Sequence, residues 1–296
     1  MHLGNIYSAL ISYLSARKAG GEWILRIEDL DRQRCKKEFS SQLMDDLLWL
    51  GLRWDNFSPP AGGLSAEFFQ SNRDSFYIKA FDSLRGQGLV YDCFCARADL
   101  LSSSAPHADD GSVIYAGRCR GLSEDDRSRL SAVRPPAKRL MVEDREICVR
   151  DGHFGLRRVS LRHDIGDFII RRGDGNFSYQ LAVVVDDALM GVDEVTRGRD
   201  LLLSAAAQTY LYEKLSLAVP RFFHLPLLLS SGRRLSKRDK DTDMGFLREN
   251  HTKEELIGKI LFLCGCVERE ERVSLEEAIG LFDWEKVRKE DVAVSS

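Results

Sequence analysis

Two basic or histidine-containing stretches have residue types suited to binding phosphate. His2-Leu3-Gly4-Asn5 stands directly before an apolar helical pattern, and Arg234-Leu235-Ser236-Lys237-Arg238 follows a predicted strand. A helix start offers free N–H groups and a positive dipole end, and Gly4 permits close backbone approach. The second stretch suits a polyphosphate whose charge grows during a reaction. The alternatives are a chain terminus with no role and a solvated basic loop.

Two further stretches suit an amino acid with its charged groups. The acidic loop Glu28-Asp29-Leu30-Asp31 fits an ammonium group, and Tyr179 with Arg197 offers a phenol and a guanidinium to a carboxylate. We expect Asp186 and Asp187 to line the same pocket. The alternatives are a capping turn for the acidic loop, a core position for Tyr179 and a surface ion pair for Arg197.

Alternating strands and helices must position these side chains. Apolar residues recur at helical spacing over 6–14, 39–50 and 76–84, and Gly20-Gly21 ends the first helix. We predict strands at 23–27, 167–172, 192–197 and 222–229, and helices at 179–187 and 201–215. This alternation predicts an α/β fold with a mostly parallel sheet covered by helices. Ligands bind such a sheet at the carboxyl ends of its strands, where the four stretches fall.

The pattern divides the chain into four parts. Residues 1–91 and 165–244 form the two halves of the α/β domain, and 92–164 is an insertion with cysteines and a polar stretch. Residues 245–296 form a helical appendage, in which Thr252 with Glu255 and Ser274 with Glu277 have capping-box spacing.

Composition limits the class of protein. The formal net charge of -3 over 296 residues argues neither for nor against nucleic acid. No apolar run approaches the roughly 20 residues of a membrane span, and we detect no leader. Seven cysteines, an odd number, do not suit a disulfide framework. We expect a reduced, cytoplasmic protein, without membrane contact and monomeric.

Taken together, the four stretches resemble class I aminoacyl-tRNA synthetases of the glutamyl branch. His2-Leu3-Gly4-Asn5 is similar to the first ATP motif of that class, and the stretch from Arg234 to Arg238 to the second. The strings at 26–31 and 179–187 resemble sequences typical of glutamyl enzymes. The resemblance implies a Rossmann-like class I domain that binds ATP with Mg²⁺ through His2, Gly4, Asn5, Arg234, Ser236 and Lys237.

The shorter glutamyl-Q tRNA(Asp) synthetase family is the more similar branch. The chain continues about fifty residues beyond the second motif, and Phe282-Asp283-Trp284 and Lys289-Glu290-Asp291 resemble the close of that family. The resemblance implies tRNA-independent activation of L-glutamate and its transfer to queuosine in the anticodon loop of tRNA(Asp). It implies that Glu28, Tyr179 and Arg197 bind glutamate, with His2 and Lys237 catalytic. RNA contacts are expected from Arg157-Arg158 and Arg171-Arg172.

The resemblance also gives the cysteines a role. Cys93, Cys95, Tyr115 and Cys119 resemble the zinc site of the family, and a C-x-C pair on a strand faces one side. His107 is a competing ligand. We expect Cys264 and Cys266 to pack in the core, and we assign no chemistry to Cys35 and Cys148.

The chain departs from the family pattern before His2. The family has a first strand there, which contributes to glutamate and ATP binding, and this chain lacks it. A misassigned or trimmed start is our preferred interpretation. The rival is a truncated or catalytically inactive relative of glutamyl-tRNA synthetase that retains only RNA or partner binding.

Overall fold

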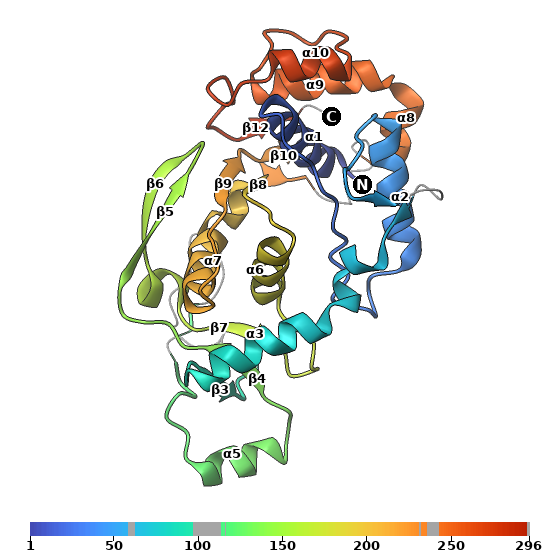
Figure 1. Ribbon diagram of the computed structural model, residues 1–296. Helices are drawn as coiled ribbons and strands as arrows, with labels where there is room; N and C mark the ends of the chain where they lie inside the picture. Colours follow the sequence, from blue (N-terminus) through green and yellow to red (C-terminus); the bar gives the residue numbers. More distant parts are fainter. Residues whose placement is uncertain (59–62, 97–113, 116, 231, 236–242, 295–296) are drawn as a thin grey trace.

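The computed structural model describes residues 1–58, 63–96, 114–115, 117–230, 232–235 and 243–294 (Figure 1). The α-helices of this part are α1 (Leu3–Lys18), α2 (Lys37–Trp49), α3 (Asp74–Gly86), α5 (Glu124–Ser131), α6 (Tyr179–Leu189), α7 (Leu202–Lys214), α8 (Met244–Asn250), α9 (Lys253–Cys264) and α10 (Leu275–Leu281). The strands are β1 (Phe57–Ser58), β2 (Gly63–Leu64), β3 (Val90–Cys93), β4 (Ala137–Leu140), β5 (Glu146–Asp151), β6 (Gly155–Ser160), β7 (Phe168–Arg171), β8 (Glu194–Gly198), β9 (Arg221–Leu225), β10 (Leu228–Ser230), β11 (Arg233–Arg234) and β12 (Val292–Ala293).

A four-stranded sheet in the order β6-β5-β9-β8 carries Arg197 on its edge strand β8. Strands β5, β9 and β8 run parallel, and β6 pairs antiparallel with β5. A separate sheet, β3-β4-β7, is antiparallel. The α/β class with a Rossmann-like parallel core is therefore confirmed, while the hairpin and the second sheet make the whole mixed rather than mostly parallel.

Two hydrophobic clusters stabilise the fold. One joins α1 and α2 to the C-terminal helices, with Leu10 and Ile260 fully buried, and the other joins α3, α6 and α7 to β5 and β7. Helices α9 and α10 lie against one end of the molecule beside α1, and α5 projects at the other end (Figure 1). Both predicted capping boxes are formed, at Thr252 and Ser274. The C-terminal helices thus share a core with the first helix.

Residues 23–27 do not form the strand that we predicted. The backbone N–H of Trp23 donates to the Asp55 carboxylate (2.6 Å), that of Leu25 to the Asn56 side chain (2.9 Å), and that of Ile27 to the Phe68 carbonyl (2.9 Å). An alternating apolar pattern gives an extended chain, but a strand also needs a neighbour. In the described part of the chain a pocket separates this segment from β8, so side chains and single backbone contacts satisfy its polar groups instead.

Candidate active site

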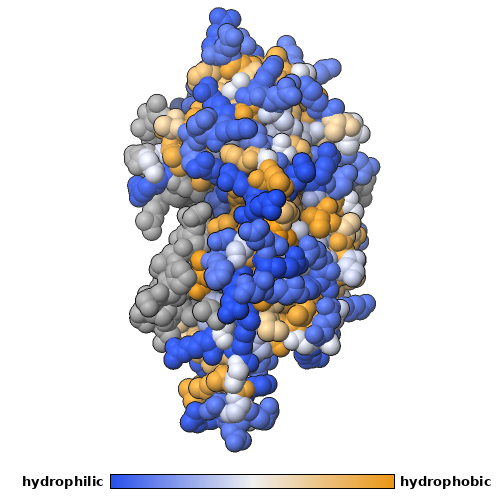
Figure 2. All heavy atoms as spheres, turned by 90° about the vertical axis from the view of Figure 1, so that its left-hand side faces the viewer, coloured by the Kyte–Doolittle hydropathy of each residue, from blue (hydrophilic) through white to orange (hydrophobic). Residues whose placement is uncertain are grey.

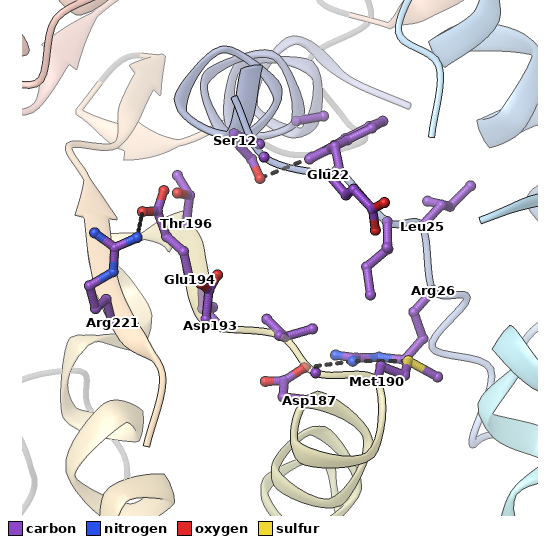
Figure 3. A pocket seen from close by; sticks show the side chains of 18 of the residues that line it. Ser12, Glu22, Leu25, Arg26, Asp187, Met190, Asp193, Glu194, Thr196 and Arg221 are labelled. Carbon is purple, nitrogen blue, oxygen red and sulfur yellow. Dashed lines mark hydrogen bonds and ion pairs between the residues drawn. The ribbon is translucent and has the colours of Figure 1, made fainter. Parts of the chain in front are cut away.

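A pocket of about 660 Å³ lies between α1, residues 21–28, the end of α6 and the edge strand β8 (Figure 3). Its polar lining is mainly acidic, with Glu22, Asp187 and Asp193 among the labelled residues, and Glu194 is paired to Arg221 at 3.1 Å. An extended segment borders one side and a sheet edge the other.

Glu28 lines this pocket and is held by Arg26. One terminal nitrogen of Arg26 lies 2.6 Å from Asp187 and the other 3.2 Å from Glu28. The Glu28 side chain keeps 41% of its surface accessible, toward the pocket. Desolvation by the surrounding protein raises its pKa, Arg26 opposes this, and the charges of Asp187 and Asp186 add to it. The result is an anionic group beside an opening, which suits a cationic ligand.

Tyr179 and Arg197 lie near Glu28, although neither lines the pocket of Figure 3. Tyr179 begins α6 directly after the N-cap Ser178, and Arg197 lies on β8. Burial raises the pKa of the Tyr179 phenol, the charge of Glu28 raises it further, and Arg197 lowers it. Tyr179 therefore lies within electrostatic reach of both Glu28 and Arg197, the other two predicted glutamate-binding residues.

The Arg197 guanidinium is buried and fixed on several sides. It donates from Nε to His224 (3.0 Å), from Nη1 to Gln208 (2.8 Å) and from Nη2 to the Leu201 carbonyl (3.3 Å). Gln208 in turn donates to Gln180 (2.8 Å). This is not the surface ion pair that we weighed as the alternative.

The two neighbouring aspartates of α6 behave differently. Asp187 lines the pocket, as expected. Asp186 does not, because it is fully buried and accepts hydrogen bonds from Gln70 (2.9 Å), Arg73 (2.6 Å) and Tyr77 (2.8 Å). Our expectation for Asp186 was therefore wrong. Its charge is compensated by partners that lie more than a hundred residues earlier in the chain, and it ties α6 to α3.

The start of α1 meets the segments that flank the second basic stretch. His2 caps the helix, and its backbone forms an antiparallel β-bridge with Asp243. The Met244 N–H donates to the Met1 carbonyl (2.9 Å). A Cβ atom added to Gly4 would come within 3.2 Å of the His2 ring, which explains the glycine. Leu235 lines a small cavity with His2 and Gly4. The first motif therefore lies beside Leu235 of the second motif and beside the segment that begins at Asp243.

Several predicted site residues cannot be placed. Ser236, Lys237 and Arg238 lie outside the described residues, as does the competing metal ligand His107. Arg234 belongs to β11, where its backbone pairs with Leu229. Asn5 accepts the His2 N–H at 3.3 Å and completes the cap of α1.

The four predicted metal ligands form one buried cluster. The sulfur atoms of Cys93 and Cys95 each lie 3.6 Å from the Tyr115 hydroxyl, and Cys95 lies 3.6 Å from Cys119. The three sulfurs all lie within 4.8 Å of one another. A zinc tetrahedron with bonds of about 2.3 Å has sulfur–sulfur edges of roughly 3.8 Å. The donor set and its spacing therefore fit zinc.

Arg139 offers positive charge to this cluster. Its guanidinium carbon lies 3.8 Å from the centre of the Tyr115 ring, and Nη1 donates to the Asp167 carbonyl (2.6 Å). Burial opposes ionisation of Cys93, but hydrogen bonds from Arg139 and Tyr115 outweigh it and lower the pKa of this thiol. Burial raises the pKa of Cys95 to about 11. Cys264 and Cys266, by contrast, lie in the core, as predicted.

The basic pairs considered for RNA differ in exposure. Arg157 and Arg158 are exposed on β6, where Arg158 lies 3.8 Å from Glu146. Arg171 covers the rings of Phe81 and Phe177, and Arg172 pairs with Asp174 at 2.7 Å. The face that carries the β5–β6 hairpin is largely hydrophilic, with scattered hydrophobic areas (Figure 2). Of the two pairs, the one on β6 is better placed to meet a polyanion.

Sequence reasoning missed the residues that hold the site together. Arg26 was part of a family-like string but had no role, and His224, Gln208 and Asp151 had none. A histidine within the apolar stretch 222–229 was the available signal, because a buried polar side chain requires a partner. The partner itself depends on how β8 and β9 align.

Comparison with known proteins identifies the family. The model of the family described as tRNA synthetases class I (E and Q), catalytic domain, matches residues 1–295. The chain belongs to this family. It is accordingly an aminoacyl-tRNA synthetase-like ligase with a class I fold. No helix in the described part of the chain has the length and apolar character needed to cross a membrane.

Named relatives fall into two groups. The chain is 43% identical to the glutamyl-Q tRNA(Asp) synthetase of Symbiobacterium thermophilum, with 99% of this chain and 92% of that protein covered. It is 37% identical to the glutamate–tRNA ligase of Sulfurihydrogenibium sp., with 98% of this chain and 61% of the ligase covered.

Solved structures share the fold. The glutamate–tRNA synthetase of Elizabethkingia anophelis superimposes with a TM-score of 0.82 at 31% identity, over 100% of this chain and 66% of that chain. The chain thus spans about two thirds of this longer enzyme and nearly all of the Symbiobacterium protein.

Proposed function

We propose that this protein activates L-glutamate with ATP in the absence of tRNA and transfers the glutamyl group to the queuosine base of tRNA(Asp). The observation that carries the first step is the convergence of Glu28, Tyr179 and Arg197 in a class I synthetase fold. An anion, a phenol and a fixed guanidinium together complement an amino acid with one ammonium and two carboxylate groups. Two observations support this proposal: Glu28 lines the pocket, and Arg197 lies on β8, the strand that borders it.

The amino acid is held by charge. Glu28 accepts the substrate ammonium group, and Arg197 with Tyr179 binds its carboxylates. Desolvation raises the pKa of Glu28 although Arg26 pairs with it, so a bound ammonium group would add a second positive charge that favours the ionised carboxylate. Arg26 also restrains Glu28 and so orients it, which reduces the entropy lost on binding.

The reaction is an in-line displacement at phosphorus. A carboxylate oxygen of glutamate forms a bond to the ATP α-phosphorus, and the bond to the pyrophosphate oxygen breaks. His2, Asn5 and the N–H groups around Gly4 bind phosphate oxygens, and Arg234, Ser236 and Lys237 hold the pyrophosphate end. Mg²⁺ bound with ATP neutralises phosphate charge.

The acceptor is proposed from the relatives. Four relatives named glutamyl-Q tRNA(Asp) synthetase are 40–43% identical to the chain, whereas the glutamate–tRNA ligases are 36–37% identical. This difference supports the queuosine base of the tRNA(Asp) anticodon loop over a 3′ adenosine. The exposed arginines of β6 are candidates for phosphate contacts, and such binding should weaken steeply with salt.

A structural zinc ion completes the proposal. Cys93, Cys95, Tyr115 and Cys119 would hold one ion in a closed, four-ligand site with no position for substrate. When bound, zinc neutralises thiolate charge and cross-links β3 to the segment before α5. Arg139 supplies further positive charge at the Tyr115 ring.

Charging of two forms of tRNA(Asp) tests the acceptor. Protein and ATP are incubated with labelled glutamate and tRNA(Asp) with or without queuosine, and the labelled nucleotide is mapped. We expect label only with queuosine, on that base, and none with Lys237→Ala or on tRNA(Glu). Equal charging of both forms at the 3′ adenosine would indicate a truncated conventional synthetase. No label and no adenylate in a folded protein would indicate an inactive relative.

A further inference from the structure

A chain of buried polar groups crosses three adjacent strands and ends at Arg197. Arg197 of β8 lies opposite His224 of β9 in the parallel ladder, and Asp151 ends β5 on the other side of β9. The His224 Nδ1 atom lies 2.6 Å from Asp151 Oδ2, and Arg197 Nε lies 3.0 Å from His224 Nε2. The side chains of Asp151 and His224 are both 0% exposed. The sheet register therefore aligns three polar side chains where water has no access.

The chemistry of the end groups fixes the direction of each hydrogen bond. A guanidinium can only donate, so His224 Nε2 must accept and must carry no proton. The neutral imidazole then carries its proton on Nδ1 and donates it to Asp151. Burial lowers the pKa of His224 and the Arg197 charge lowers it further, against the opposing effect of Asp151. The histidine is thus a neutral link between an anion and a cation.

Asp151 is itself fixed by the backbone. Its second oxygen, Oδ1, accepts the N–H groups of His153 (3.0 Å) and Phe154 (2.7 Å) in the turn after β5. Both oxygens of an ionised carboxylate only accept, so Oδ2 accepts the proton that His224 carries on Nδ1. The β5–β6 turn holds the carboxylate in place, and the carboxylate sets the tautomer of His224.

Arg197 keeps donor capacity beyond its fixed contacts. Three of its five N–H groups are engaged by His224, Gln208 and the Leu201 carbonyl. The Tyr179 phenol is a further hydrogen-bonding partner of the guanidinium. The guanidinium and the phenol can therefore meet a substrate carboxylate together.

We propose that Asp151 and His224 are positioning residues for glutamate, because they hold the Arg197 guanidinium in the orientation that presents it, beside Tyr179, to a substrate carboxylate. The inference rests on the proposed role of Arg197 in binding a substrate carboxylate. If His224 only filled space in the core, its contribution would not depend on which imidazole nitrogen carries the proton. If it orients Arg197, the contribution depends on the tautomer. A test must therefore change the tautomer with little change in shape.

Asp151→Asn makes that change. The amide oxygen must still accept the N–H groups of His153 and Phe154, so the amide NH₂ faces His224 Nδ1. The imidazole then carries its proton on Nε2, which opposes the Arg197 Nε–H. We expect the dissociation constant for L-glutamate to rise about 10- to 100-fold, with ATP affinity unchanged. Asp144→Asn, a like change at an exposed residue, is the control.

Two substitutions of His224 separate its hydrogen bond with Arg197 from its hydrogen bond with Asp151. His224→Gln places an amide oxygen near Nε2 and keeps an acceptor for Arg197, so it should bind glutamate much as the wild type does. His224→Asn keeps a partner for Asp151 but leaves Arg197 Nε unmet, and it should weaken binding as Asp151→Asn does. Calorimetry gives the affinities, thermal melts check the fold, and nitrogen–proton correlation spectra identify the protonated ring nitrogen.

The outcomes are distinct. Wild-type glutamate affinity in both Asp151→Asn and His224→Asn would overturn the positioning role and leave the proposed function standing. A proton on Nε2 of His224 in the wild-type protein would overturn it with no variant needed. A folded wild-type protein that binds ATP but not glutamate would contradict the proposed function and this inference together.

Discussion

The thiol cluster and the glutamate site are built in opposite ways. The cluster joins residues 20 to 24 positions apart in the chain, and Cys93, Tyr115 and Cys119 are all less than 9% exposed. The glutamate site joins Glu28 to Tyr179 and Arg197 across most of the chain, and Glu28 remains 41% exposed. One is a closed site made from nearby residues, and the other is an open site held by distant elements.

This difference predicts that the two sites can be separated by mutation. A closed metal site contributes to the free energy of folding and has no vacant position for substrate. An open site with fixed charges contributes to binding and to the reaction rate. Changes in the cluster should therefore alter stability, and changes at Glu28 or Arg197 should alter glutamate kinetics.

The largest kinetic effect is expected from Arg197→Lys. Lysine keeps the charge but is a single point donor, so it cannot bond His224 and Gln208 and also meet a substrate carboxylate. We expect kcat/KM for glutamate in pyrophosphate exchange to fall on the order of 10²–10³-fold. The thermal midpoint and zinc content are the accompanying measurements, and Arg85→Lys, in a surface ion pair, is the matched control. Exchange at the wild-type rate would remove Arg197 from the site.

The opposite pattern is expected from Cys119→Ser. Loss of one thiolate should reduce bound zinc below one ion per chain and lower the thermal midpoint by roughly 5 °C, equivalent to about 2 kcal/mol. The KM for glutamate, measured below the transition, should stay unchanged. Cys148→Ser, at an exposed cysteine, should alter neither. Unchanged zinc content in Cys119→Ser, or no metal in unchelated wild-type protein, would contradict the metal site.

Residue separation also explains how much the sequence could predict. Helix α1 and both capping boxes depend on neighbouring residues and were predicted correctly. The clustering of the cysteines followed from a short spacing and a family resemblance. These features need no knowledge of which strands are adjacent.

The failures involve partners that are distant in the chain. A strand was predicted at 23–27, but a ladder depends on a neighbour that no local pattern supplies. Asp186 was expected in the pocket, but Arg73 and Tyr77 bury it. The bond between His224 and Arg197 requires the register of β8 on β9. Lys237 and Ser236 lie outside the described residues, so their roles remain predictions.

A smaller effect concerns pH and stability. The folded protein keeps His224 neutral because burial lowers its pKa, whereas the unfolded chain takes up a proton near pH 6.5. Stability from neutral His224 is therefore present above about pH 6.5 and is lost as pH falls toward the lowered pKa. As the pH falls from 7 to 5.5, we expect the wild type to lose more unfolding free energy than His224→Gln. Denaturant titrations of both proteins measure this, and parallel pH curves would contradict a neutral His224.

Glutamate-dependent exchange of pyrophosphate into ATP, without tRNA, tests the central claim most directly. The protein used should be folded and analysed for zinc, so that the closed site is intact when the open one is assayed. The account predicts saturable exchange with L-glutamate and none with L-glutamine, which lacks the second carboxylate, and loss of exchange in Arg197→Lys. A zinc-loaded, ATP-binding protein that shows no glutamate-dependent exchange would contradict the account.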